Sequence, residues 1–82
     1  MTRDEAYARY RDTLVSVLEL DPDAVVPEAT WEALEVDSLA VLELNLALQD
    51  EFDVELPEPD PESIVTVGDA FAVVAAALAL PA

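Results

Sequence analysis

The sequence of 82 residues predicts an all-α fold, a small bundle of three to four helices with a long first loop. Apolar residues recur at intervals of three and four in three separate segments, which is the pattern of amphipathic helices. Residue types that cap helix N-termini precede these segments. The one stretch with strand-like alternation, residues 52–56, is too isolated to form a sheet. A chain of this length is expected to form one small domain over residues 1–82.

The first helix is expected over residues 3–18. Thr2 and Glu5 match the capping box, in which two side chains accept hydrogen bonds from free backbone N–H groups at the helix start. Arg9 and Arg11 are expected to solubilise this helix rather than to bind anything. The apolar residues at helical spacing are Tyr7, Tyr10, Leu14, Val17 and Leu18.

A long connection follows, to about residue 36, and two prolines interrupt it. A connection of this length in so small a domain normally needs anchors in the core, or it has a function. We interpret Trp31 as a residue that pins the loop to the core, in preference to one that stacks on a ligand. The candidate anchors are Val25, Val26, Trp31 and Leu34.

Ser38 is the residue most suited to carry chemistry, because it lies at the start of a second helix, expected over residues 38–51. Asp and Ser are preferred N-cap residues, since their side-chain oxygens accept free backbone N–H groups. A helix N-terminus also binds phosphate well, so an exposed hydroxyl there is a good anchor for a phosphodiester. The alternative is a plain helix cap. Partial loss of a cap on replacing Ser38 by alanine is expected to cost about 0.5–2 kcal/mol.

The second helix has two apolar stripes, whereas a helix on the surface of a small bundle usually needs one. The helix is therefore either central to the bundle or presents one stripe to a partner. Periodicity alone leaves both interpretations open. One stripe contains Val41, Leu44, Leu48 and Phe52. The other contains Leu39, Leu42 and Leu46, bordered by Glu43 and Asp50.

An extended loop is expected after the second helix, because three prolines between residues 57 and 61 exclude regular structure. Val54 and Leu56 are expected to point inward from this loop. A short helical turn is expected over residues 60–64, with Pro61 at its first position.

The last helix is expected over residues 67–80, and Pro81 should end it. Thr66 and Asp69 match a cap of the T-x-x-D kind. Gly68, the only glycine, is interpreted as a site of close packing near the helix start. The residues expected on its buried face are Val67, Phe71, Val74, Ala75 and Leu78.

The charge of the chain is strongly negative, with 19 Asp and Glu against 3 Lys and Arg and a formal net charge of −16. Nucleic acid and anionic membranes are therefore excluded as expected partners, and basic protein surfaces are favoured. The apolar run over residues 70–82 is too short to span a bilayer. The polar N-terminus does not match a signal peptide. A cytoplasmic location is expected.

The sequence lacks His, Cys and Lys. This composition excludes a Ser/His/Asp triad, a Cys/His pair and a Schiff-base lysine. The usual zinc ligands are missing, and the acidic residues do not follow the EF-hand pattern. No catalytic residue and no metal ligand is therefore expected, and the chain is not expected to be an enzyme.

Four segments of the chain form a recognisable pattern by their order and spacing. They are Asp37-Ser38-Leu39, Glu43-Leu44, the run from Glu51 to Pro57, and the run from Ile64 to Ala70. This pattern resembles the acyl carrier proteins over nearly the whole chain. Trp31 and Leu34 occupy positions where that family usually has an aromatic residue and a leucine.

The resemblance implies that Ser38 receives a 4'-phosphopantetheine arm from coenzyme A, through a phosphopantetheinyl transferase that uses magnesium. The thiol at the end of the arm would hold acyl groups as thioesters. Asp37 would cap the second helix and assist loading. The implied partner surface contains Leu39, Leu42, Glu43, Leu46 and Asp50. Its partners would be basic surfaces of ketosynthase, acyltransferase or ligase-type enzymes, and the carrier itself is expected to be a monomer.

Some residues depart from the family pattern. Glu35 stands where the family usually has glycine, so a different arrangement of the loop is expected. Ala40, Asn45 and Gln49 make the recognition helix less charged than in a fatty-acid carrier. With the lack of lysine, this favours polyketide or related specialised biosynthesis. The alternatives are a fatty-acid or aminoacyl carrier, a non-loaded acidic interaction module, and a divalent-ion binder.

Overall fold

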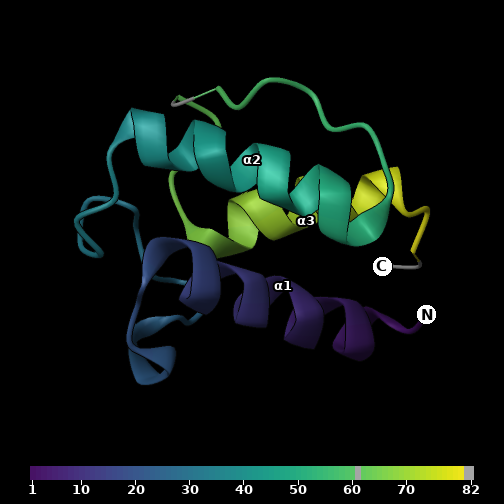
Figure 1. Ribbon diagram of the computed structural model, residues 1–82, viewed down its shortest axis with the longest axis horizontal. Coiled ribbons are helices and arrows are strands. Elements are labelled where there is room, and N and C mark those ends of the chain that lie inside the picture. Colours follow the sequence, from purple (N-terminus) through teal and green to yellow (C-terminus); the bar gives the residue numbers. More distant parts are fainter. Residues whose placement is uncertain (61, 81–82) are drawn as a thin grey trace.

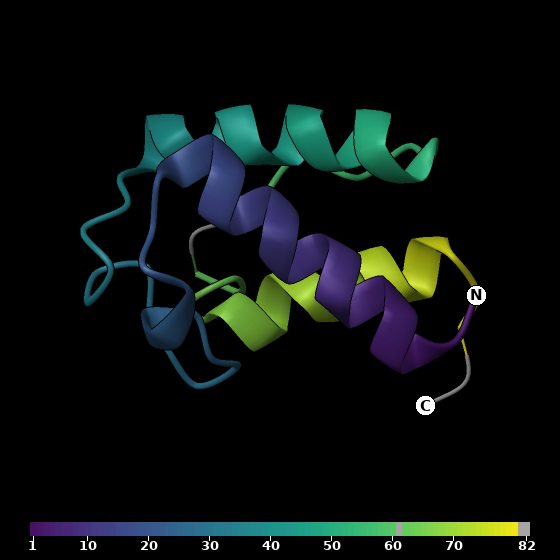
Figure 2. The same ribbon diagram turned by 60° about the horizontal axis from the view of Figure 1, so that its bottom comes forward.

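The computed structural model describes residues 1–60 and 62–80, and it confirms the all-α prediction. The described residues form three main helices. Figure 1 shows the long first loop at one end of the bundle. Figure 2 shows that α1 lies across both α2 and α3. Pro61 and Pro81, expected to start a turn and to end the last helix, lie outside the described residues. The elements are α1 (Arg3–Leu18), the short 3-10 helix η1 (Pro22–Ala24), α2 (Ser38–Phe52) and α3 (Val67–Ala77).

The helix starts follow the cap chemistry of the sequence. The predicted capping boxes are present at Thr2 with Glu5 and at Thr66 with Asp69. The N-cap of α2 is Asp37, whose Oδ1 accepts a hydrogen bond from the backbone N–H of Ala40 at 2.8 Å. The prediction that replacing Ser38 would cost stability by removing a helix cap is therefore wrong, because Asp37 and not Ser38 caps α2.

The helix ends follow one repeated geometry. Each of the three helices is followed by a residue with positive φ, namely Glu19 (54°), Asp53 (53°) and Ala79 (56°). The next residue then donates its N–H to a carbonyl five positions earlier, as in a Schellman motif. The third helix ends at Ala77, three residues before the predicted end, because the backbone reverses at Ala79.

The core lies between the three helices. The apolar residues predicted for the first and last helices, except Val17, are buried in it or pack against it half-buried. Tyr10 is fully buried, and its hydroxyl donates a 2.8 Å hydrogen bond to the carbonyl of Val67. Val17 and Val26 were expected to be buried, but their exposed fractions are 39% and 41%. Both lie on the outer side of their segments. The buried side chains are Ala6, Tyr10, Leu14, Val25, Trp31, Leu44, Leu48, Phe52, Val67, Phe71, Val74 and Ala75.

Arg9 and Arg11 do more than solubilise α1, so that expectation is wrong. Arg9 forms a 3.0 Å ion pair with Glu51 and lies over the ring of Phe52, which joins α1 to α2. Arg11 donates hydrogen bonds to the carbonyls of Pro22 and Val25. The cations of α1 therefore fasten neighbouring elements to it.

The long first loop is tied to the start of α3 by backbone hydrogen bonds. The N–H of Trp31 donates to the carbonyl of Val65, and Thr30 forms an isolated β-bridge with Thr66. The N–H of Gly68 donates to the carbonyl of Pro27 at 2.9 Å. A Cβ at position 68 would lie only 3.0 Å from that carbonyl oxygen, so the predicted close packing is confirmed.

The second loop, between α2 and α3, is held by its half-buried side chains. Val54 and Leu56 pack against the core, as predicted. The N–H of Ile64 donates to the carbonyl of Asp60 at 2.8 Å, which closes one helical turn. The two loops approach each other where Trp31 meets Val65.

Asp69 makes the start of α3 sensitive to acid. The backbone N–H groups of Val65 and Thr66 donate to its carboxylate and hold the pKa of that group below its ordinary value. Because its pKa is lowered in the folded state, the ionised Asp69 carboxylate stabilises the fold at pH values above its ordinary pKa, near 4. This stabilisation is lost as the pH falls through the lowered pKa. As the pH falls below about 4, Asp69→Asn should therefore lose less stability than the wild type. Urea unfolding at several pH values measures this. Glu58→Gln, which removes one charge from the exposed second loop, is the control, and equal slopes for both variants would contradict the prediction.

Candidate functional site

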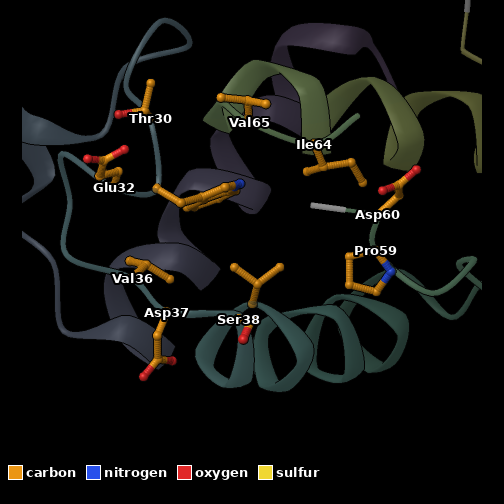
Figure 3. Close-up of a pocket in the computed structure, with 11 residues that line it drawn as sticks. Thr30, Glu32, Val36, Asp37, Ser38, Pro59, Asp60, Ile64 and Val65 are labelled. Atoms are coloured by element: carbon orange, nitrogen blue, oxygen red, sulfur yellow. The ribbon is translucent and has the colours of Figure 1, made fainter. Parts of the chain in front are cut away.

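Ser38 is the first residue of α2, and its side chain is exposed. In Figure 3, Ser38 and Asp37 lie along one side of a cavity, opposite Ile64 and Val65. Asp37 is exposed as well, and its carboxylate points away from the cavity. The structure therefore places the predicted pair together at the start of the helix, and both residues are exposed.

The backbone at this helix start can bind an anion. Asp37 accepts the N–H of Ala40 through its side chain and the N–H of Val41 through its carbonyl at 3.0 Å. The N–H groups of Ser38 and Leu39 have no acceptor among the described residues. Both belong to the positive end of the α2 dipole, which favours a phosphate group next to the Ser38 hydroxyl.

A cavity of about 260 Å³ adjoins Ser38. Segments far apart in the sequence form it: the end of the first loop, the start of α2 and the end of the second loop. Its lining is mostly apolar, and it was not predicted from the sequence. The lining residues are Thr30, Trp31, Glu32, Val36, Asp37, Ser38, Val41, Pro59, Asp60, Ile64 and Val65.

The loop before Ser38 contains a strained residue. Residues 31–34 form a helical turn, in which Thr30 Oγ1 accepts the N–H of Ala33 at 3.0 Å. Glu35 ends this turn with φ of 59°, and the N–H of Val36 then donates to the carbonyl of Trp31. The backbone at Glu35 thus takes the left-handed conformation that glycine favours. Glutamate in place of the glycine usual in the family is therefore accommodated by strain at this one residue.

Glu35→Gly should raise the free energy of unfolding by about 0.5–1 kcal/mol, because glycine removes the steric cost of the left-handed conformation. Glu35→Ala is the matched control, since it removes the same charge and keeps the Cβ. Chemical denaturation of the two variants measures the difference. If alanine stabilises the protein as much as glycine does, the gain comes from charge and not from the backbone.

The second apolar stripe of α2 is exposed, so it is not part of the core of the bundle. The exposed fractions of Leu39, Leu42 and Leu46 are 64%, 41% and 65%. Glu43 and Asp50 are exposed beside them. The other stripe packs into the core. An apolar surface edged by carboxylates therefore lies on the helix that Ser38 begins.

Asn45 and Gln49 do not belong to this exposed surface, contrary to their interpretation as part of the recognition face. Both are half-buried on the side of α2 that faces the second loop. Asn45 Nδ2 donates to the carbonyl of Pro57, and Gln49 Oε1 accepts the N–H of Leu56. They attach the second loop to α2.

Two further properties concern the described residues as a whole. No group of three or more acidic side chains in ranges 1–60 and 62–80 is arranged to hold a metal ion. Within the same ranges, no helix has the length and apolar character needed to cross a membrane.

Comparison with known proteins identifies relatives over most of the chain. The family model described as the phosphopantetheine attachment site matches residues 10–73. An acyl carrier protein of Bdellovibrio bacteriovorus is 41% identical over 64 residues, which are 77% of this chain and 82% of the relative. An acyl carrier protein of Thermosynechococcus vestitus is 40% identical over 70 residues, 84% of this chain and 86% of the relative. One from Picosynechococcus is 36% identical over 72 residues, 87% of this chain and 89% of the relative.

A solved structure shows the same arrangement of helices. It is the carrier protein from Agrobacterium tumefaciens in complex with an engineered Bradyrhizobium japonicum glycine:[carrier protein] ligase and ATP. The match has a TM-score of 0.71 and 25% sequence identity. It covers 84% of this chain and 95% of the carrier.

Proposed function

The chain belongs to the acyl carrier proteins, non-catalytic carriers whose cofactor is 4'-phosphopantetheine, and from this premise we propose that Ser38 is the residue that carries the arm. The family model spans this position. Ser38 is exposed, and its hydroxyl adjoins two free backbone N–H groups at the start of α2. This is the observation that carries the proposal.

The residues around Ser38 fit a phosphodiester. The N–H groups of Ser38 and Leu39 can donate to phosphate oxygens, and the helix dipole favours the negative charge. Asp37 fixes the start of the helix through its hydrogen bond to Ala40, and we assign it the role of positioning the loading reaction. When bound, the arm supplies a terminal thiol for thioester chemistry, which this cysteine-free chain cannot supply itself.

The exposed stripe of α2 is the proposed partner surface. Leu39, Leu42 and Leu46 supply apolar contacts, and Glu43 and Asp50 supply charge for basic enzyme surfaces. The transferase must reach Ser38, so it is the first such partner. Ketosynthase, acyltransferase or ligase-type enzymes are the further partners that we propose for this surface. The Agrobacterium carrier, which has the same fold, is held in a complex with a ligase.

Polyketide or related specialised biosynthesis is the proposed pathway class, with fatty-acid and aminoacyl carriers as the alternatives. Because Asn45 and Gln49 face the second loop, they do not bear on the pathway class. Two observations still favour specialised biosynthesis: the uncharged Ala40 near the proposed partner surface and the absence of lysine. We further propose that residues 1–82 form one carrier domain that acts as a cytoplasmic monomer. Transfer rates from this carrier to a polyketide and to a fatty-acid ketosynthase would compare the pathway classes.

Intact-mass measurement tests the proposed function. The purified protein is incubated with coenzyme A, magnesium and a broad-specificity phosphopantetheinyl transferase. The proposal predicts a mass gain of one phosphopantetheine. A folded protein that gains no mass would instead favour a non-loaded interaction module, which the exposed stripe of α2 would also suit.

A further inference from the structure

Trp31 contains a buried hydrogen-bond donor that the fold does not use. Its side chain has an exposed fraction of 6%. Its indole Nε1 is buried and has no hydrogen-bond partner among residues 1–60 and 62–80. Buried tryptophan N–H groups usually find a partner. Among the described residues the hydroxyl of Tyr7 is also buried without a partner, but Tyr7 does not line the cavity beside Ser38, whereas Trp31 does. The N–H of Trp31 is therefore the unpaired group that could meet an acceptor in that cavity.

The position of Trp31 indicates where that acceptor comes from. Trp31 lines the cavity next to Ser38, so any group attached to the Ser38 hydroxyl begins at the edge of the space that Trp31 borders. The cavity volume of about 260 Å³ corresponds to roughly nine water-sized groups, at about 30 Å³ for each. Val36, Val41 and Ile64 make most of the surrounding surface apolar, so an acceptor there would have few competing donors.

The chemistry required of the occupant follows from the lining. It must be narrow and mainly apolar, and it must carry one oxygen that accepts a hydrogen bond. The acidic residues that line the cavity, Glu32, Asp37 and Asp60, are exposed and do not accept from the indole. A purely hydrocarbon occupant would leave the indole N–H unpaired in an even drier surrounding, which costs free energy.

We propose that Trp31 donates a hydrogen bond from Nε1–H to a carbonyl oxygen of the group that Ser38 carries. This inference rests on the proposed function. Trp31 then determines specificity, because it favours oxygenated groups in the cavity over hydrocarbon groups of the same length. The carbonyl can belong to an amide of the arm, to the thioester or to a 3-oxo group of the cargo, and the chemistry is the same in each case.

The single tryptophan of the chain provides a direct readout, because a 15N-labelled sample gives one indole N–H signal. Four samples are compared: the apo protein, and protein loaded from coenzyme A, butyryl-coenzyme A or 3-oxobutyryl-coenzyme A. The proposal predicts a downfield shift of the indole proton at one of these steps, with solvent exchange slowed about tenfold. The step at which the signal moves identifies the arm, the thioester or the cargo as the source of the carbonyl.

Intact masses of the same samples separate the two proposals. Full loading with an indole signal that is identical in all four samples would overturn the role of Trp31 and leave the proposed function standing. Failure to load at Ser38 would overturn both.

Trp31→Phe provides the second test, because it keeps an aromatic ring in the core and removes the donor. The rise in urea midpoint between the apo protein and the loaded protein is the readout. Loading should stabilise the wild type more than the variant, by the share that the hydrogen bond contributes. An equal rise in both proteins, with circular dichroism showing that both are folded, would overturn the inference.

Discussion

We expect the replacement of Ser38 by alanine to abolish the gain of phosphopantetheine and to leave the free energy of unfolding within about 0.5 kcal/mol of the wild type. Loading is lost because the variant has no hydroxyl at the helix start. Stability is kept because Ser38 is exposed and Asp37, not Ser38, caps α2. Intact mass after treatment with the transferase measures loading, and urea denaturation measures stability.

Two variants control this experiment. Ser16→Ala removes an exposed serine from α1 and should load like the wild type. Asp37→Ala removes the cap and should cost about 0.5–2 kcal/mol of stability. A mass gain in Ser38→Ala, or a loss of stability as large as that of Asp37→Ala, would contradict the assignment of roles.

Leu44→Ala and Leu46→Ala should separate the two faces of α2. The exposed fraction of Leu44 is 1%, so its truncation leaves a cavity and should cost about 2–5 kcal/mol. The exposed fraction of Leu46 is 65%, so its truncation should change stability by less than about 0.5 kcal/mol. Because the two changes are chemically identical and lie on one helix, urea denaturation isolates the effect of burial.

Leu46→Ala also tests the partner surface. Leu46→Ala should lower kcat/KM for loading by the transferase, by about tenfold if Leu46 is an important contact. Val17→Ala, at an exposed apolar position of α1, is the control and should load at the wild-type rate. Equal loading rates for Leu46→Ala and the control would remove Leu46 from the partner surface.

The starts of the helices were predictable because their chemistry is local. Thr2 with Glu5, Asp37, and Thr66 with Asp69 each satisfy backbone N–H groups within the next few residues. The ends were less predictable, since the usual signal is glycine at the residue with positive φ. Here glutamate, aspartate and alanine occupy those positions. The residues after Ala77 continue the apolar pattern of α3, so the sequence does not indicate that the helix ends there.

The position of Ser38 was predictable for the same local reason, whereas the cavity beside it was not. Trp31, Val36 and Ile64 meet there only because the first loop is hydrogen-bonded to the segment before α3. Tryptophan at position 31 indicated a core residue, and nothing in its neighbourhood indicated that its N–H would remain unpaired. Similarly, Arg9 reaches Glu51 across 42 positions of sequence, so its role could not be read from α1 alone.

Localising the modification within the loaded protein tests the central claim most directly. Cleavage after Glu35 and Glu43 releases residues 36–43, in which Ser38 is the only side chain with a hydroxyl. We expect this peptide to carry the mass of phosphopantetheine and its fragmentation to place that mass on Ser38. The same mass on any other peptide of the loaded protein would contradict the account.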